Sequence, residues 1–242
     1  MRNIIALLLV GAVPGYASLL SDADLAIDMD ASQAGNGYLY ASRCRGDDRA
    51  WQRKGSTGLT TGSDGITSVD LDYIQYPAGY GPVVPQYYTQ AFWIQFKDHT
   101  SKRTLFRFDY DHSIYVDANS DRLGMYSNRD GGVHQTSFQI SAGRWYFITV
   151  SGTGSTATLS GGKQDYYVAS CVRCENPHMG WQGITYRVVS GTKHYRIGHA
   201  GQAPGRVARA MLYHRKLTWD EMHTLLKETQ PDNMICPSGK YS

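Results

Sequence analysis

The sequence predicts a nearly all-β protein, folded as a sandwich or barrel, with one short helix near its C-terminus. Composition, a series of short strand-like runs and a single helix signal support this prediction. Of 242 residues, 26 are glycine and 18 are tyrosine, whereas glutamate occurs only at Glu175, Glu221 and Glu228. Tyrosine favours strands and glycine favours turns, so this glutamate-poor composition indicates strands joined by turns.

The strand-like runs are apolar or alternate between apolar and polar residues, and turn residues separate them. They cover 91–96, 104–110, 113–117, 123–126, 144–150, 156–160, 194–198 and 207–213. The run 104–110 alternates with a period of two, which predicts a strand with one face exposed to water. Turn-forming residues at 118–121 and 151–154 predict two hairpins.

The one convincing helix begins at Thr218, three residues before Glu221, which is the spacing of a capping box. Apolar residues then follow at helical spacing, at Trp219, Met222, Leu225 and Leu226. The pattern ends near Glu228.

The N-terminus has the three parts of a secretory signal peptide. Arg2 gives a positive start, 4–13 is apolar, and small residues surround Ala17. The apolar run is too short for the roughly 20 residues that a membrane-spanning helix needs. We therefore expect residues 1–17 to be a cleaved signal peptide, and 18–242 to form a single secreted domain with no membrane span. A buried N-terminal strand or helix is the alternative.

Four cysteines in an exported chain predict two disulfides, for which three pairings are possible. We favour Cys171–Cys174 together with Cys44–Cys236, because the second bond would tie the two ends of the domain together. A redox pair is a further interpretation of Cys171 and Cys174, and half of a zinc site that includes His178 is another.

The chain carries a net charge of +3 and contains no run of lysine or arginine. A nucleic-acid partner is therefore not expected.

Three segments resemble the concanavalin A-like lectin/glucanase superfamily, and in particular its laminin-G-like jelly-roll domains. They are 91–96 with its Phe-x-Trp pattern, the strand 143–150 that Trp145 leads, and the closing block 195–222. The resemblance covers roughly 85–230. It implies an all-β, two-sheet antiparallel jelly-roll sandwich (concanavalin A-like) with one short C-terminal helix. Its members are mostly carbohydrate-binding or adhesive modules, often assisted by calcium, with a minority of glycoside hydrolases and lyases.

No catalytic residue is predicted. The Glu-x-Asp-x-(x)-Glu motif of hydrolases with this fold is missing, as are the motifs of the lyases and the Gly-x-Ser-x-Gly elbow. Two acidic pairs, Asp70 with Asp72 and Asp109 with Asp111, keep a polysaccharide-cleaving enzyme as an alternative.

Oxygen ligands recur at alternate positions at Asp117, Asn119 and Asp121, as they do in a calcium loop. These residues are the predicted site of a calcium ion. The alternative is an ordinary polar hairpin turn. A helix-loop-helix calcium site is excluded, because Arg122 and Asn128 stand where glycine and glutamate are required.

Candidate ligand-binding residues are aromatic or polar side chains in predicted loops. Tyr76, Tyr80 and Tyr87 belong to a Pro/Gly-rich segment, and His178 and Trp181 follow Cys171 and Cys174. Tyrosine offers a ring for stacking and a hydroxyl for hydrogen bonding, as sugar recognition requires. Core packing is the alternative for Tyr87 and Trp181. The sequence thus predicts a secreted, non-catalytic module that recognises glycan or another extracellular surface, with a structural or adhesion protein that binds protein partners as the second alternative.

Overall fold

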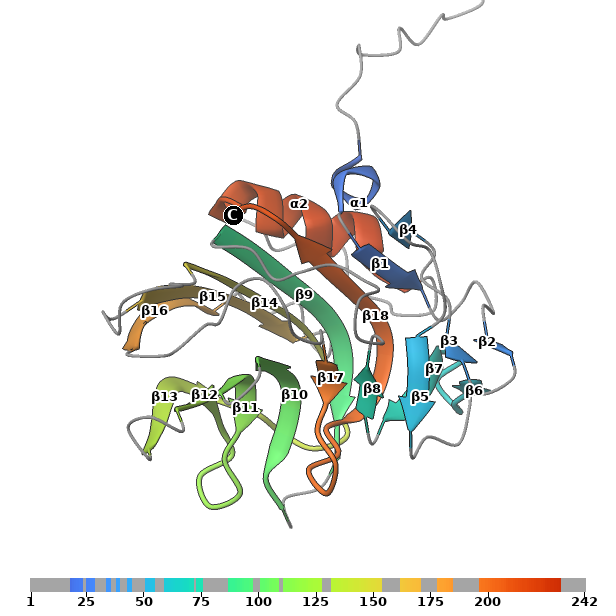
Figure 1. Ribbon diagram of the computed structural model, residues 1–242, viewed down its shortest axis with the longest axis horizontal. Coiled ribbons are helices and arrows are strands. Elements are labelled where there is room, and N and C mark those ends of the chain that lie inside the picture. The colour runs from blue at the N-terminus through green and yellow to red at the C-terminus, as the bar shows by residue number, and fades with distance from the viewer. Residues whose placement is uncertain are drawn as a thin grey trace, which may run out of the picture.

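The computed structural model describes residues 18–23, 25–28, 34–35, 38–39, 43–44, 51–54, 59–71, 73–75, 87–97, 101–108, 111–127, 132–153, 162–170, 178–184 and 196–231. In these residues two antiparallel sheets stack face to face, and a helix, α2 (Trp219–Thr229), lies near the C-terminal end of the chain (Figure 1). The predicted two-sheet sandwich with a short C-terminal helix is therefore confirmed. A single turn, α1 (Leu19–Asp22), was not predicted. The signal peptide predicted over 1–17 lies outside the described residues.

The first sheet, here sheet A, is built around the pairing of β9 with β18. Its strand order is β16 (His178–Ile184), β15 (Gly162–Ser170), β14 (Trp145–Thr153), β9 (Tyr87–Phe96), β18 (Gly205–Tyr213), β1 (Leu25–Asp28) and β4 (Arg43–Cys44). β7 (Thr67–Leu71) pairs with the first part of β18, and β6 (Leu59–Thr61) pairs with β7. Strands from both ends of the chain therefore meet at β18.

The second sheet, sheet B, contains the hairpin predicted at 118–121, which joins β11 to β12. Its order is β13 (Gly132–Gln139), β12 (Arg122–Ser127), β11 (Asp111–Val116), β10 (Arg103–Phe108), β17 (Arg196–Gly198), β8 (Tyr73–Gln75), β5 (Trp51–Lys54), β3 (Tyr38–Leu39) and β2 (Ala34–Gly35). The predicted run 104–110 corresponds to β10.

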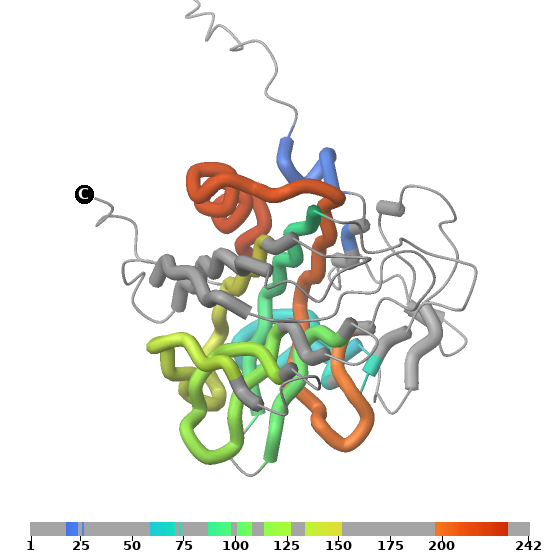
Figure 2. Tube along the Cα trace, turned by 60° about the vertical axis from the view of Figure 1, so that its left-hand side comes forward, coloured from blue at the N-terminus to red at the C-terminus, as the bar shows by residue number. Residues whose placement is uncertain are grey.

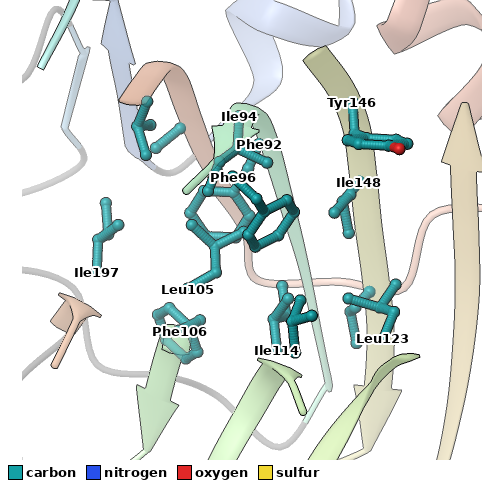
Figure 3. Close-up of a cluster of buried hydrophobic side chains, with 14 of the residues drawn as sticks. Phe92, Ile94, Phe96, Leu105, Phe106, Ile114, Leu123, Tyr146, Ile148 and Ile197 are labelled. Carbon is teal, nitrogen blue, oxygen red and sulfur yellow. The ribbon is translucent and has the colours of Figure 1, made fainter. Parts of the chain in front are cut away.

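The main core lies between the two sheets (Figure 3). Phe92 of sheet A and Phe106 of sheet B bring their ring centroids to 6.3 Å, and both side chains are fully buried. Burying one such side chain contributes roughly 1.5–3 kcal/mol, so this layer is a large source of the stability of the fold. Aliphatic side chains from both sheets fill the rest, among them Ile94, Leu105, Ile114, Leu123, Ile148 and Ile197.

A second apolar cluster covers the outer face of sheet A, on the side away from sheet B. The helix α2 lies across this face (Figure 1) and buries Met222, Leu225 and Leu226 against it. The indole Nε1 of Trp93 donates a 3.0 Å hydrogen bond to Thr229 Oγ1 at the end of the helix. The predicted capping box is confirmed: Thr218 Oγ1 accepts from the backbone N–H of Glu221, and the Glu221 carboxylate accepts from the backbone N–H of Thr218.

The second predicted hairpin is wrong in its position. Residues 151–153 were expected in a turn, but they lie inside β14, where Ser151 pairs with Asp165 and Gly152 with Gln164. The reason is that β9 pairs with β14 along its whole length, up to Tyr87 opposite Thr153, so the strand continues through the glycine. The partner of β14 is β15 at 162–170, whereas 154–161, with the predicted strand 156–160, lies outside the described residues.

The predicted disulfides fall largely outside the described residues. Cys44 is the last residue of β4, where it pairs with Leu25 of β1. Its side chain is not described, and Cys171, Cys174 and Cys236 lie outside the described residues. Both disulfides therefore stay predictions.

No helix in the described part of the chain is long and apolar enough to cross a membrane.

Candidate functional site

The outer face of sheet B, the face turned away from the core, carries polar and aromatic side chains. Ile114, Val116 and Met125 point into the core, so their neighbours on β11 and β12 point to the opposite face. We define the sheet B outer face by Lys102, Thr104, Arg107, Tyr115, Tyr126, His199 and Gln202. Both described helices lie on the sheet A side (Figures 1 and 2), so neither covers this face.

Two tyrosines form the aromatic part of the sheet B outer face. Tyr115 of β11 and Tyr126 of β12 have ring centroids 6.0 Å apart with an interplanar angle of 42°. The ammonium of Lys102 lies 5.3 Å from the centroid of the Tyr126 ring. Tyr115 is only 1% exposed, whereas Tyr126 is half-buried. The pair therefore forms a buried floor with one more accessible ring beside it.

The phenol of Tyr115 keeps its proton under all physiological conditions. Burial raises its pKa to about 12, and the negative charge of Asp117 acts in the same direction. The proximity of Tyr126 adds to the increase, while the Arg103 charge opposes it. Tyr115 is therefore a neutral donor and acceptor on this face, not a general base.

A polar network joins β10 to the loop that follows β17. Arg107 Nη1 contacts His199 Nε2, and His199 Nδ1 lies 2.9 Å from the carbonyl oxygen of Ala200. A carbonyl can only accept, so Nδ1 carries the proton and Nε2 accepts from Arg107. Thr104 Oγ1 donates to Gln202 Oε1 at 2.6 Å, and the backbone N–H of Thr104 donates to the Gln202 carbonyl at 3.1 Å. These bonds fix the guanidinium, imidazole, hydroxyl and amide groups relative to the tyrosines.

The predicted calcium residues lie in the turn between β11 and β12. Asp117 Oδ2 accepts hydrogen bonds from the backbone N–H groups of Asn119 and Ser120, at 3.2 and 3.0 Å, and from the Ser120 hydroxyl at 2.9 Å. Asp121 has a positive φ of 55° and pairs with the buried Arg103. In this structure these carboxylates therefore stabilise a hairpin turn. No three His, Cys, Asp or Glu side chains gather as a metal site among the described residues, and the calcium site stays a prediction.

Tyr87 lies on a different surface from the sheet B outer face. It begins β9 and is 49% exposed, while the next residue, Tyr88, is fully buried in the core. Alternation therefore places Tyr87 on the outer face of sheet A. Thr89 Oγ1 accepts from the backbone N–H of Leu217 at 2.9 Å, so Tyr87 lies near the start of α2, where Trp219 is 37% exposed.

The other predicted ligand residues cannot be placed as fully. His178 and Trp181 were expected in a loop, but both are in β16, and their side chains are not described. Tyr76 and Tyr80 lie outside the described residues. The structure thus does not bring the predicted ligand-binding residues together in one site. The residues of the sheet B outer face were not proposed as a site from the sequence. The period-two pattern of 104–110 predicted a strand with one wet face, but Thr104 is buried and Arg107 is partly buried.

Unlike the sheet B outer face, a polar cluster on sheet A has a structural role. Arg206 of β18 donates to Asp64, Gln95, Ser68 and the carbonyl of Ile66, at 3.0 to 3.3 Å. Trp145 Nε1 donates to Asp64 at 2.8 Å, and its ring lies under the guanidinium at 5.2 Å. Burial alone would raise the pKa of Asp64, but hydrogen bonds from Trp145, Arg206 and Ile66 and the Arg206 charge lower it. The cluster binds the 62–66 turn to the sheet.

The acidic pairs that kept the enzyme alternative are only partly described. Asp70 forms a 3.0 Å ion pair with Lys97. Asp72 and Asp109 lie outside the described residues, and the side chain of Asp111 is not described.

No protein-family model matches the sequence, and no curated protein matches it. Solved structures do resemble the fold. Trypanosoma rangeli sialidase in complex with sialic acid aligns with a TM-score of 0.54 at 13% identity, over 90% of this chain and 36% of that chain. Domain 4 of AbnA, a GH43 extracellular arabinanase from Geobacillus stearothermophilus, in complex with arabinotriose, aligns with a TM-score of 0.50 at 14% identity. The alignment covers 84% of this chain and 98% of that chain. This chain therefore spans about a third of the sialidase, and its β-sandwich fold is shared with domains of carbohydrate-related proteins.

Proposed function

We propose that this chain is a non-catalytic carbohydrate-binding module, and that the sheet B outer face is its binding surface. The observation that carries the proposal is the difference between the two outer faces. On sheet A an apolar face is covered by α2. On sheet B the described side chains are tyrosines and hydrogen-bonding groups, and neither described helix covers them.

The chemistry of this face suits a sugar. A pyranose or furanose ring has apolar C–H patches that pack on an aromatic ring, and hydroxyls that exchange hydrogen bonds with polar side chains. Tyr126 would supply the ring, and Arg107, His199 and Gln202 would supply donors and acceptors. Because the network of this face already holds Arg107 and His199, binding would cost less side-chain entropy than it would on a mobile surface.

The fold likeness supports the same class of ligand without selecting a sugar. One similar structure holds arabinotriose and another holds sialic acid, so both neutral and acidic sugars are reasonable test ligands. We further propose membership of the concanavalin A-like superfamily, with its laminin-G-like jelly roll as the nearest form. We also propose secretion as one domain, 18–242, with two disulfides.

The test is a glycan array followed by calorimetric titration of any positive sugar, with the secreted protein in the presence and absence of a chelator. Tyr126→Ala and Arg107→Ala should each weaken binding at least about tenfold, which corresponds to 1.4 kcal/mol. Tyr87→Ala is the matched control, because it removes an exposed tyrosine from the outer face of sheet A. A loss of calcium-dependent binding on chelation would support the metal site at Asp117, Asn119 and Asp121.

The outcomes separate the alternatives. Binding that Tyr87→Ala abolishes and Tyr126→Ala leaves intact would move the site to the outer face of sheet A. New reducing ends or unsaturated products in the same mixtures would replace the binding module by a polysaccharide-cleaving enzyme. Absence of binding to every neutral and acidic glycan, with and without calcium, would overturn the carbohydrate proposal and favour a protein partner.

A further inference from the structure

The first described segment of the chain is held against the end of α2 by one carboxylate. Glu228 Oε2 accepts a 2.9 Å hydrogen bond from the Ser18 hydroxyl and a 3.2 Å hydrogen bond from the backbone N–H of Leu20. The Tyr213 hydroxyl adds a 3.1 Å bond to the carbonyl of Leu19. Figures 1 and 2 show α1 beside this end of α2. Residues 18–23 are thus bound to the folded domain from Ser18 onward.

Glu228 occupies an electrostatically unfavourable position for an acid. It lies in the last turn of α2, next to its final residue Thr229. The C-terminal end of a helix carries a partial negative charge, so cations are favoured there and carboxylates are not. Lys227 lies in the same turn, and Arg209 donates to the carbonyl of Thr229. The donors that reach the Glu228 carboxylate from Ser18 and Leu20, however, are neutral. A further cation at Ser18 would stabilise this carboxylate directly.

Processing after Ala17 would supply that cation. Hydrolysis of the Ala17–Ser18 peptide bond consumes one water molecule, leaves a carboxylate on Ala17 and frees the α-amine of Ser18. The amine takes a proton below about pH 8, the usual range of an α-amino group. The nitrogen and Oγ of one serine are roughly 3 Å apart, and Oγ lies 2.9 Å from Glu228 Oε2. The ammonium would therefore lie within about 6 Å of the carboxylate, the range in which opposite charges stabilise each other.

We infer that the mature chain begins at Ser18, and that its new α-ammonium pairs with Glu228 to fasten the N-terminus to the C-terminal helix. The inference rests on the proposed signal peptide, and is independent of carbohydrate binding. Removal of the leader does more than release the protein, because it creates a charge that the unprocessed chain lacks. The Glu228 carboxylate is already placed beside Ser18 to receive it.

The pairing has a defined pH dependence. An ammonium that gains a partner on folding has a raised pKa, so its stabilisation is fully present below the unfolded value of about 7.7–8.0 and disappears as the pH rises above the folded value. The other charged or titratable groups on the elements in contact here are Asp22 on α1, His223 in the middle of α2 and Lys227 in its last turn, and Arg209 and Tyr213 of β18. The Arg209 guanidinium donates to the carbonyl of Thr229. Burial and the Lys227 charge lower the pKa of His223 from 6.5, so measurements from pH 7 upward leave it neutral.

The first measurement is the intact mass and N-terminal sequence of the secreted protein, which should begin at Ser18. Selective acetylation of the α-amine, the least basic amine in the chain, then removes the charge. At pH 7 acetylation should lower the melting temperature by about 1–3 °C, the shift expected for a fraction of a kcal/mol in a domain of this size. At pH 9.5 the difference should disappear.

Acetylating two single variants separates the proposed pair from a general effect of acetylation. In Glu228→Gln, acetylation should leave the melting temperature unchanged at pH 7, because the partner charge is gone. Asp220→Asn is the matched control, since it removes an exposed acid from the opposite end of the same helix, and acetylation should still destabilise it. A mature N-terminus other than Ser18 would overturn the processing site, and an equal acetylation effect with Glu228→Gln would overturn the pairing. Neither result would bear on carbohydrate binding.

Discussion

The outer faces of the two sheets differ in what their side chains do. On sheet A the outward residues are large and apolar, among them Trp93, Phe147 and Met211, and α2 buries them. On sheet B the outward residues include Tyr126, Lys102 and Arg107, and they contact one another and the loop after β17. The central strands of sheet A therefore stabilise the fold through both faces. Sheet B packs its inner face in the main core; on its outer face Lys102 is exposed and Tyr126 and Arg107 are partly exposed, while Tyr115 and Thr104 are buried.

The same contrast holds for the two arginines nearest these faces. Every nitrogen of the Arg206 guanidinium donates to a group of sheet A or of the 62–66 turn. Arg107 instead contacts an imidazole that a neighbouring carbonyl holds in one tautomer. We therefore expect substitutions of sheet A to change stability, and substitutions of the sheet B outer face to change binding.

Trp93→Ala should produce the largest effect. The side chain is fully buried, its ring lies 5.1 Å from that of Phe147, and its indole N–H binds the end of α2. Truncating such a residue leaves a cavity and costs about 3–5 kcal/mol. Urea unfolding would measure the loss, and Trp93→Phe, which keeps a ring but loses the hydrogen bond, should recover more than half of it. A loss below about 1 kcal/mol would show that α2 does not depend on this face.

Arg206→Met should cause the next largest loss of unfolding free energy, about 2 kcal/mol, because it leaves the partly buried Asp64 without its guanidinium partner. The pH dependence provides a second readout. The lowered pKa of Asp64 means that its contribution to stability is present above the unfolded value of 3.8 and is lost as the pH falls through the folded value. In Arg206→Met this acid-induced loss should shrink. An unchanged acid profile, measured by urea unfolding between pH 2 and 7, would contradict the assigned role.

Features that depend on neighbouring residues could be predicted from the sequence. The capping box needs only Thr218 and Glu221, three residues apart, and the structure has it in place. The pattern of 104–110 likewise located the strand β10, but its predicted wet face is not seen, since residues 103–106 are buried and Arg107 is partly buried. The limits of β14 could not be predicted, because they depend on pairing with β9, more than fifty residues earlier in the chain.

The candidate site could not be predicted for the same physical reason. Tyr115 and Tyr126 meet only once the register of β11 and β12 is set, and His199 reaches Arg107 only through the pairing of β10 with β17. The position of α2 decides which outer face is covered, and no local pattern contains that information. Tyr87 and Tyr88 show that residue type alone does not predict burial, since Tyr87 is exposed and Tyr88 is buried.

Thr218→Ala tests how firmly α2 is held on sheet A. Loss of the cap should cost about 1 kcal/mol, since the Thr218 hydroxyl accepts from the backbone N–H of Glu221. Burial alone would raise the pKa of Glu221, but hydrogen bonds from Thr218 and Arg215 lower it. Its stabilising contribution is therefore present at neutral pH and is lost as the pH falls through the lowered folded value. Thr218→Ser, which keeps the hydroxyl, should retain the stability of the original protein in the same unfolding experiment.

Tyr126→Ala should produce the smallest change in stability, and it is the sharpest test of the comparison. Its ring is half-buried, and its neighbours include Tyr115 and Lys102. Pairs of this kind are worth roughly 0.5–1.5 kcal/mol, and the loss is reduced where water can replace the contact. We therefore expect a cost near 0.5 kcal/mol, far below that of Trp93→Ala on the other sheet. A cost of about 3 kcal/mol or more would mean that the sheet B outer face is a second packing surface, and the site would then have to be sought around Tyr87 and Trp219.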